Sequence, residues 1–479
     1  MNVKNILLIR TTDNPWRIPP LGVLYIASII RNKHQEYNIK IIDYMHEVSD
    51  FRGFIKSVSD FSPDVIGFSS LTCEFKLFKE LTSLARKAAP KSTLIAGGPL
   101  ASSYCNMAVK DRLVDFAVIG EGELTISELL DTIQNCGDPS GVKGIAYLKD
   151  GEIVITPPRE YIQNLDEIPF PSWDLINLKS YSKVPNWNGV LSGEYYAPLM
   201  TSRGCIYHCI YCHDFFGKTF RPRSAENVLS EMEFLYKNHD IREFHIIDDI
   251  FNFDLERVRL ICNNIIQRKL KIRLSFPNGI RADRMDNETL ALLRKAGTYK
   301  ITYAVESASP RLQKFIKKNL DLKKAKDIIE LTSKMNIVTA GFFMLGFPTE
   351  TAEEMKETVS FAINSRLDTA KFFKVIPFCN TELAGISPNF KYGSDLKYSK
   401  ETSYYDEELN FSSIPLDILN NILLECHWKF YTKFSRIFRI LAKYRSLAAL
   451  KGLLTVYTYV LMRRSAEKGK RHSESNNGC

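Results

Sequence analysis

The chain has 479 residues, of which 45% are hydrophobic and 25% are charged, so it can form two or three globular domains and is not a disordered chain. Its net charge of +9 is concentrated at the carboxyl terminus, because from Lys429 onward there are 12 Lys and Arg but only two Glu. The remainder is close to neutral, which gives no reason to expect nucleic-acid binding by the core.

The first 140 residues alternate short apolar runs with segments of helix length. The runs are rich in branched residues, which is typical of buried strands. This alternation predicts an α/β fold, a Rossmann-like, doubly wound parallel sheet with helices on both faces. The predicted strands are 4–10, 38–43, 64–69, 91–96 and 115–119, and the helices between them include 21–31, 75–88 and 124–133.

Small and hydroxyl residues follow the strands of this sheet, at the edge where such folds bind ligands. Glycine lets a flat ligand approach the backbone, and hydroxyls supply hydrogen bonds. No GxGxxG or P-loop occurs, and carboxylates at Glu121 and Glu123 would repel a pyrophosphate, so a nucleotide site is disfavoured. The alternative is that the loops are only tight turns. The candidate binding residues are Ser69, Ser70, Thr72, Gly97, Gly98, Gly120, Glu121 and Gly122.

A connector follows the first domain. Residues 142–155 predict a β-hairpin around Lys149-Asp150-Gly151, and four prolines then indicate irregular chain up to Ser182. We expect this linker to lie on the surface of the domains, with Trp173 docking it.

The middle of the chain repeats a strand–helix unit six times. Such units in series close toward a barrel, with active residues at the carboxyl ends of the strands. The pattern therefore predicts a partial, TIM-like (β/α)6 barrel. The predicted strands are 197–202, 243–248, 271–276, 299–305, 337–345 and 370–377, with amphipathic helices such as 224–237 and 322–334.

Three cysteines, Cys205, Cys209 and Cys212, come directly after the first barrel strand in a CxxxCxxC spacing. This differs from the CxxCxxC run of ferredoxins, and no fourth cysteine follows nearby. Three thiolates can hold three irons of a 4Fe-4S cluster and leave the fourth open to a substrate. The alternative is a zinc site, because His208 and His213 lie beside the cysteines.

This spacing, with an aromatic residue (Tyr211) before the last cysteine, resembles the radical S-adenosylmethionine (radical SAM) enzymes. The resemblance implies that the open iron binds S-adenosylmethionine, and that an electron from the cluster splits it to methionine and a 5'-deoxyadenosyl radical. A low-potential donor of the flavodoxin or ferredoxin type would supply the electron. No catalytic side chain beyond the cluster ligands is assigned.

The same resemblance implies the S-adenosylmethionine site. The pair Asp248 and Asp249 stands where the family has a Gly-Gly-Glu segment, Glu306-Ser307 matches the strand-four motif, and residues 341–350 match the segment that packs on adenine. Arg281 is equally compatible with a salt-bridged surface residue. The expected site residues are Tyr211, Asp248, Asp249, Arg281, Glu306, Ser307, Gly341, Phe343 and Gly346. Cys379, at the barrel mouth, is expected to be a buried, inert thiol.

The loops of the first domain resemble those of the cobalamin-binding domain that precedes many radical SAM cores. The DxHxxG motif of proteins that ligate cobalt through histidine is absent, and we interpret His46 as a surface residue. The resemblance implies cobalamin bound without a histidine ligand. A degenerate domain that keeps the fold but has lost the cofactor is the alternative.

From Leu416 the chain is predicted to be helical, with Lys429, Lys433, Arg436, Arg439 and Lys443 at spacings of three and four. Such a stripe can lie on an anionic membrane surface. The alternative is a helical cap over the barrel whose charges face solvent. The expected domains are residues 1–140, 141–194 (linker with hairpin), 195–385 (barrel), 386–464 (helical extension) and 465–479 (disordered tail).

The sequence thus predicts an enzyme that methylates an unactivated carbon of a small organic or lipid-like substrate, or closes or rearranges a ring in it. The polar start and scattered cysteines favour the reducing cytoplasm, with peripheral contact at the inner face of the membrane through the tail. The alternatives are a radical SAM enzyme without cobalamin and a zinc-bearing binding protein with a basic tail.

Overall fold

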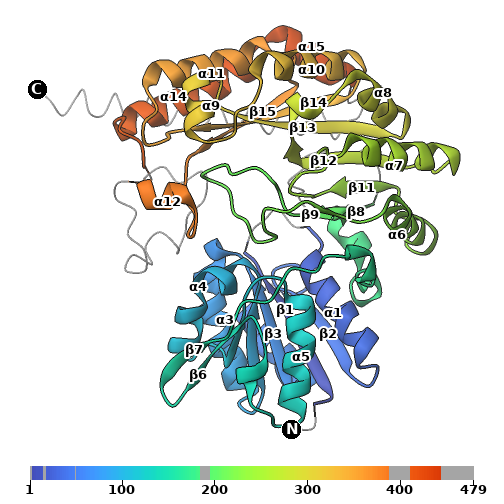
Figure 1. Cartoon of the computed structure of the whole chain (residues 1–479), viewed down its shortest axis with the longest axis vertical. Coiled ribbons are helices and arrows are strands. Elements are labelled where there is room, and N and C mark those ends of the chain that lie inside the picture. Colours follow the sequence, from blue (N-terminus) through green and yellow to red (C-terminus); the bar gives the residue numbers. More distant parts are fainter. Residues whose placement is uncertain (1–2, 14–17, 49, 184–194, 388–409, 444–479) are drawn as a thin grey trace, which may run out of the picture.

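The computed structural model describes residues 3–13, 18–48, 50–183, 195–387 and 410–443. A seven-stranded sheet covered by helices is followed by a six-stranded parallel sheet and two carboxyl-terminal helices. Figure 1 shows the first part below and the second above, with strand β8 of the second sheet at the junction. The predicted fold class is confirmed.

The first sheet has the strand order β2-β1-β3-β4-β5-β6-β7, in which β1 to β5 are parallel and the last two strands form an antiparallel hairpin. Asp150 and Gly151 at the hairpin turn have φ of 52° and 87°, the left-handed values that a tight hairpin needs. The predicted hairpin is confirmed, and it extends the first sheet. The strands are β1 (Asn5–Thr11), β2 (Asn38–Asp43), β3 (Val65–Ser70), β4 (Thr93–Gly97), β5 (Phe116–Val118), β6 (Ile145–Lys149) and β7 (Glu152–Ile155).

Helices cover both faces of this sheet. Helices α1 (Leu21–Lys33) and α5 (Gly122–Gln134) pack on one face, and their apolar residues join the main core. On the other face, a second core lies under α2 (Phe51–Phe61), α3 (Phe75–Ala88) and α4 (Gly98–Lys110). Gly97 ends β4 and Gly98 begins α4, so the strand leads directly into the helix at these two candidate residues.

The second sheet has the order β8-β11-β12-β13-β14-β15, and every neighbouring pair is parallel. Its first and last strands do not pair, so it is an open part of a barrel, as predicted. The strands are β8 (Tyr196–Leu199), β11 (Glu243–Ile246), β12 (Arg273–Ile280), β13 (Thr298–Glu306), β14 (Val338–Leu345) and β15 (Thr369–Lys374). The helices between them are α6 (Ala225–Asn238), α7 (Leu255–Gln267), α8 (Asn287–Lys295), α9 (Pro310–Phe315), α10 (Leu322–Lys334) and α11 (Ala352–Asn364).

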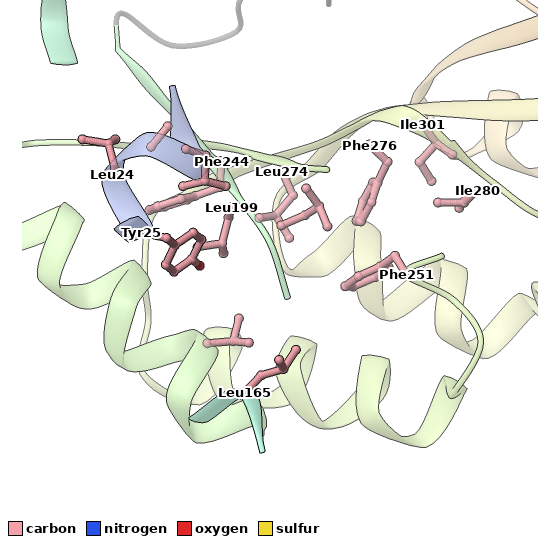
Figure 2. Close-up of a cluster of buried hydrophobic side chains, with 14 of the residues drawn as sticks. Leu24, Tyr25, Leu165, Leu199, Phe244, Phe251, Leu274, Phe276, Ile280 and Ile301 are labelled. Carbon is pink, nitrogen blue, oxygen red and sulfur yellow. The ribbon is translucent and has the colours of Figure 1, made fainter. Parts of the chain in front are cut away.

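The two parts share one hydrophobic core. Leu24 and Tyr25 of α1 belong to the same buried cluster as Leu199 of β8 and Phe244 of β11 (Figure 2). Trp173 of the connector is fully buried in this cluster, so the prediction that it docks the linker is confirmed.

The connector also packs against the end of β2. The ring of His46 stacks on Tyr181 with 3.8 Å between centroids, and its Nε2 lies 2.6 Å from Ser180 Oγ. Tyr181 in turn donates to Asp43 at 2.7 Å. The interpretation of His46 as an ordinary surface residue is therefore wrong, because the chain around Tyr181 covers it.

The carboxyl-terminal helices α14 (Leu416–Tyr431) and α15 (Phe434–Lys443) confirm the predicted helical extension. The Tyr431 hydroxyl donates to the Ala370 carbonyl at 2.8 Å and accepts from its N–H at 3.2 Å, at the edge strand β15. Within the predicted extension 386–464, residues 388–409 and 444–464 lie outside the described residues, and so does the whole predicted tail 465–479. None of the helices in the described ranges is long and apolar enough to span a bilayer.

Three of the five basic residues of the predicted stripe, Arg436, Arg439 and Lys443, face the barrel. The predicted helical cap is confirmed, but the interpretation that its charges face solvent is wrong for these three residues. Arg436 is 1% exposed and donates to the Leu367 carbonyl at 2.9 Å, while Arg439 and Lys443 each lie 2.6 Å from a carboxylate oxygen of Asp368. The exposed side of this helix instead carries Phe434 and Phe438. These three side chains hold α15 on the barrel, whereas Lys429 of α14 is exposed and pairs with Glu425 at 2.8 Å.

We expect Asp368→Asn to destabilise the protein, because it removes the buried anion opposite Arg439 and Lys443. The free energy of unfolding should fall by about 3 kcal/mol, measured by urea denaturation. The control is Asp60→Asn, which breaks an exposed pair with Lys56 and should cost less than about 1 kcal/mol. Equal stability of the two variants would show that α15 does not depend on Asp368.

Candidate functional site: the cysteine loop and the facing cavity

The three cysteines lie on a loop framed by two short strands, β9 (Ser202–Arg203) and β10 (Arg221–Pro222). At the start of the loop, Gly204 has φ of +82°, and a Cβ added there would lie 2.2 Å from the Thr219 carbonyl oxygen. Only glycine fits this position. The Cys205 N–H donates to the Gly217 carbonyl at 3.2 Å, which folds the two ends of the loop together.

The loop rests on a small hydrophobic cluster. Ile210, between two of the cysteines, is buried with Leu312, Met344 and Phe347, and its N–H donates to the Ile316 carbonyl at 3.2 Å. The triplet therefore has a rigid base at the carboxyl end of the barrel, where the sequence predicts it.

The thiols form one electrostatic group. Desolvation and the negative charge of Cys209 and Cys205 raise the pKa of Cys212 to about 12. Desolvation also raises the pKa of Cys205, so three thiolates would coexist here only next to positive charge. The zinc alternative needs ligands that converge on one point. In the described part of the chain, no three His, Cys, Asp or Glu side chains are arranged around a single metal-ion position.

Asp248 and Asp249 fix the cysteine loop from the neighbouring strand. Asp248 is buried and accepts from the Thr201 N–H at 2.6 Å and from Ser202 Oγ at 2.6 Å, and Asp249 accepts from the Gly204 N–H at 3.0 Å. Helix α7 is capped by Asp254, so neither carboxylate caps it. The Asp248 carboxylate is thus occupied by hydrogen bonds to Thr201 and Ser202. The Asp249 carboxylate lies nearer to the cysteines.

A buried lysine that the sequence interpretation missed lies beside the last cysteine. Lys318 is 6% exposed, and its ammonium lies 3.3 Å from the Tyr211 hydroxyl and 3.4 Å from Glu306 Oε1. Glu306 has φ of +65°, at a point where the β13–β14 register shifts. Burial raises the pKa of Glu306, although the Lys318 charge opposes this. The irregular backbone thus turns a carboxylate and an ammonium toward the cysteine loop.

Arg281 and Ser307 have structural partners. Arg281 is buried, forms an ion pair with Asp283 at 2.7 Å, and lies over the ring of Tyr207, within the cysteine loop, at 4.0 Å. Arg281 therefore forms an ion pair and also contacts the cysteine loop. Ser307 Oγ lies 3.3 Å from Thr358 Oγ1, which joins β13 to α11.

The β14 segment contributes its backbone. The Phe343 side chain is fully buried and stacks on Phe372 in the core, which corrects the expectation that this side chain faces a ligand. Gly341 permits this packing, since a Cβ there would lie 2.6 Å from Leu367. Gly346 has φ of +98°, and its N–H donates to the buried Glu350 carboxylate at 2.6 Å.

A cavity of about 230 Å³ lies at the carboxyl ends of the first sheet and opens toward the barrel. Six of the eight predicted residues line it: Ser69, Gly97, Gly98, Gly120, Glu121 and Gly122. Ser70 and Thr72 do not, because Ser70 bonds to Thr11 in the sheet and Thr72 begins a short 3-10 helix. Met200, Arg203 and Phe216 of the second domain complete the lining.

The Glu121 carboxylate is committed to the second domain. It accepts from Arg203 at 2.9 Å, from Arg221 at 2.9 and 3.1 Å, and from the Ile162 N–H at 2.8 Å. Burial alone would raise the pKa of Glu121, but the hydrogen bond from Arg221 and the charge of Arg203 outweigh it and lower the pKa. Glu121 lines the cavity, but its charge is already neutralised.

Cys379 makes a second contact between the domains. It is half-buried, its Sγ contacts the Tyr104 hydroxyl of α4, and burial raises its pKa. The expectation of full burial is wrong, because Cys379 lies where α4 meets the barrel mouth.

Two family models match the chain, the B12 binding domain over residues 13–130 and the radical SAM superfamily over residues 199–362. An uncharacterized methyltransferase of Pyrococcus horikoshii is 29% identical over 445 residues, which cover 92% of this chain and 94% of the relative. The anaerobic magnesium-protoporphyrin IX monomethyl ester cyclase of Rubrivivax gelatinosus is 25% identical over 371 residues, covering 76% of this chain and 65% of the relative.

Among solved structures, the radical S-adenosylmethionine methyltransferase TsrM of Kitasatospora setae, with cobalamin and a 4Fe-4S cluster bound, superposes with a TM-score of 0.67. It is 18% identical, and the match covers 81% of this chain and 78% of TsrM. Fold and motifs agree with the two family models. The chain thus carries a B12-binding domain followed by a radical SAM domain, in the order that the sequence predicts.

Proposed function

We propose that this protein uses a 4Fe-4S cluster, S-adenosylmethionine and cobalamin to methylate an unactivated carbon of a small organic or lipid-like molecule. The observation that carries the proposal is that Arg203, just before the cysteine loop, and Phe216, within it, line the glycine-rich cavity of the first domain. A donor of methyl groups and a source of radicals would then lie on either side of one substrate.

The cysteine loop fits a 4Fe-4S cluster. Cys205, Cys209 and Cys212 would each hold one iron, and the positive charge of the irons would offset the desolvation and the mutual repulsion that raise the pKa of Cys205 and Cys212. When bound, the cluster supplies the electron that cleaves S-adenosylmethionine. The chain itself orients the loop through Asp248, Asp249 and Gly204.

Lys318 supports binding of the amino-acid end of S-adenosylmethionine. Its ammonium has three donor hydrogens, and Tyr211 and Glu306 lie 3.3 and 3.4 Å from it, so it can donate a stronger hydrogen bond to an arriving carboxylate. The neighbouring Glu306 carboxylate can accept from an amino or hydroxyl group. Both side chains are buried, which strengthens their interaction with a charged ligand.

The cavity of the first domain supports cobalamin. Its glycines leave space at the carboxyl ends of β4 and β5. Apolar residues such as Leu8 and Ile95 also line the cavity, which suits a flat ring. None of the residues that line it is a histidine. We therefore propose binding without a histidine ligand to cobalt, and the cofactor-free domain remains the competing hypothesis.

Ring formation is a second candidate reaction, favoured by the similarity to a magnesium-protoporphyrin IX monomethyl ester cyclase. Radical formation would be common to both reactions, and they differ in whether a methyl group reaches the substrate. The electron donor stays a prediction.

The first prediction concerns the radical chemistry. Anaerobically reconstituted protein should contain about four irons per chain and, with dithionite, release 5'-deoxyadenosine from S-adenosylmethionine. In Cys209→Ala this release should fall at least about 100-fold, because one iron loses its ligand; Cys136→Ala, an exposed cysteine outside the loop, is the control. Zinc without sulfide in the wild-type protein would sink the proposal.

Lys318→Met should weaken S-adenosylmethionine binding about tenfold or more, because it removes the buried ammonium but keeps the length of the side chain. Titration of the cluster-loaded protein measures this. Lys317→Met, at an exposed neighbour that pairs with Glu382, is the matched control and should change little. Unaltered binding by Lys318→Met would show that the ammonium does not contact the ligand.

Gly97→Val tests the cavity. The backbone of Gly97 is extended, and an added Cβ has no neighbour closer than 3.8 Å, so the protein should fold while the larger side chain fills the cavity. We expect bound corrin, measured by its absorption, to drop about tenfold with iron content unchanged. Gly141→Val, in open space away from the cavity, is the control. Full corrin loading in Gly97→Val would show that cobalamin binds outside this cavity.

A further inference from the structure

Four charged side chains meet at the boundary between the two domains. Glu121 and Glu123 come from the loop that begins α5, and Arg203 and Arg221 come from the short strands that frame the cysteine loop. All four side chains are at most 8% exposed. With two positive and two negative charges, the group is neutral, and a change in one member leaves a buried charge unpaired.

Arg203 is the member that joins the two ligand sites. Its guanidinium donates to Glu121 at 2.9 Å and to Glu123 at 2.5 Å, and it lies between the rings of Tyr25 and Phe216, at 5.5 and 5.1 Å. The guanidinium therefore has one orientation, set by two carboxylates and two aromatic rings. It also lines the cavity.

The backbone of Arg203 leads directly into the cysteine loop. One residue, Gly204, separates it from Cys205, and the positive φ and close packing of Gly204 leave it little freedom to absorb a displacement. On the other side, Glu121 and Glu123 flank Gly122, whose added Cβ would lie 3.1 Å from Ile26. A ligand that displaces the 120–123 loop would therefore move Arg203, and Arg203 would move the Cys205 end of the loop.

We propose that Arg203 is a positioning residue through which occupancy of the first-domain cavity changes the affinity of the cysteine-loop site for S-adenosylmethionine. This inference rests on the proposed function. In coupling of this kind each ligand changes the affinity for the other by the same factor, which is usually about 5- to 150-fold. We expect about tenfold tighter binding of S-adenosylmethionine when the cavity is filled.

The test compares the Kd for S-adenosylmethionine of cluster-loaded full-length protein with and without bound hydroxocobalamin, by anaerobic calorimetry. The readout is the ratio of the two Kd values. A variant that merely loosens the fold changes both Kd values and leaves their ratio unaltered. Arg203→Lys keeps the buried charge but cannot hold two carboxylates as a planar fork does. Glu123→Gln removes one of the two partners and serves as a second variant.

Glu128→Gln is the matched control. Glu128 lies on the same helix as Glu123 and pairs with Arg159 of the connector, away from the cysteine loop. The ratio should be about ten in wild type and in Glu128→Gln, and below about two in Arg203→Lys and Glu123→Gln.

A ratio that stays near ten in both variants, or that is one in wild type, overturns the inference. These results leave the proposed function intact, because both ligands still bind. Wild-type protein that loads a cluster but binds no S-adenosylmethionine in either state contradicts the proposed function, and the inference falls with it.

Discussion

The pairing of Arg203 and Arg221 with Glu121 is the interaction on which the arrangement of the two domains depends. It neutralises charges that neither domain could bury alone, and it joins the loop at the carboxyl end of β5 to the strands that frame the cysteines. The shared apolar core of α1, β8 and β11 supplies adhesion, but apolar contact is not directional. The ion pairs fix the orientation, so that the glycine-lined cavity faces the cysteine loop.

This orientation has a chemical consequence. A carbon radical must be kept from water and oxygen, and the reacting groups must be held close together. The connector, with Trp173 buried in the core, and the contact between Tyr104 and Cys379 add further contacts between the domains. The helices α14 and α15 cover the open edge at β15, and the basic residues Arg436, Arg439 and Lys443 of α15 serve that packing.

The fold and the cysteine site follow from local patterns in the sequence. Alternating strands and helices, the hairpin turn at Asp150-Gly151 and the CxxxCxxC spacing are all set by near neighbours in the chain. The features that the sequence did not reveal depend on partners distant in the chain. Arg203 lies directly before the cysteine motif, but the carboxylates with which it pairs, Glu121 and Glu123, lie about 80 residues away. Nothing near Lys318 in the sequence marks it as buried, because its partner Glu306 lies 12 residues away. The sequence assigns the basic residues of α15 to a membrane surface or to solvent, because their partner Asp368 is distant in the chain.

The central claim is that cobalamin and the cluster face each other at a fixed separation. The most direct test is the EPR spectrum of protein loaded with both cofactors and reduced to the paramagnetic cluster and cob(II)alamin. We predict magnetic coupling between the two centres that splits or broadens the cob(II)alamin signal relative to protein loaded with corrin alone. Superposition of two independent signals would contradict the account, because it would mean that the two centres are not held together.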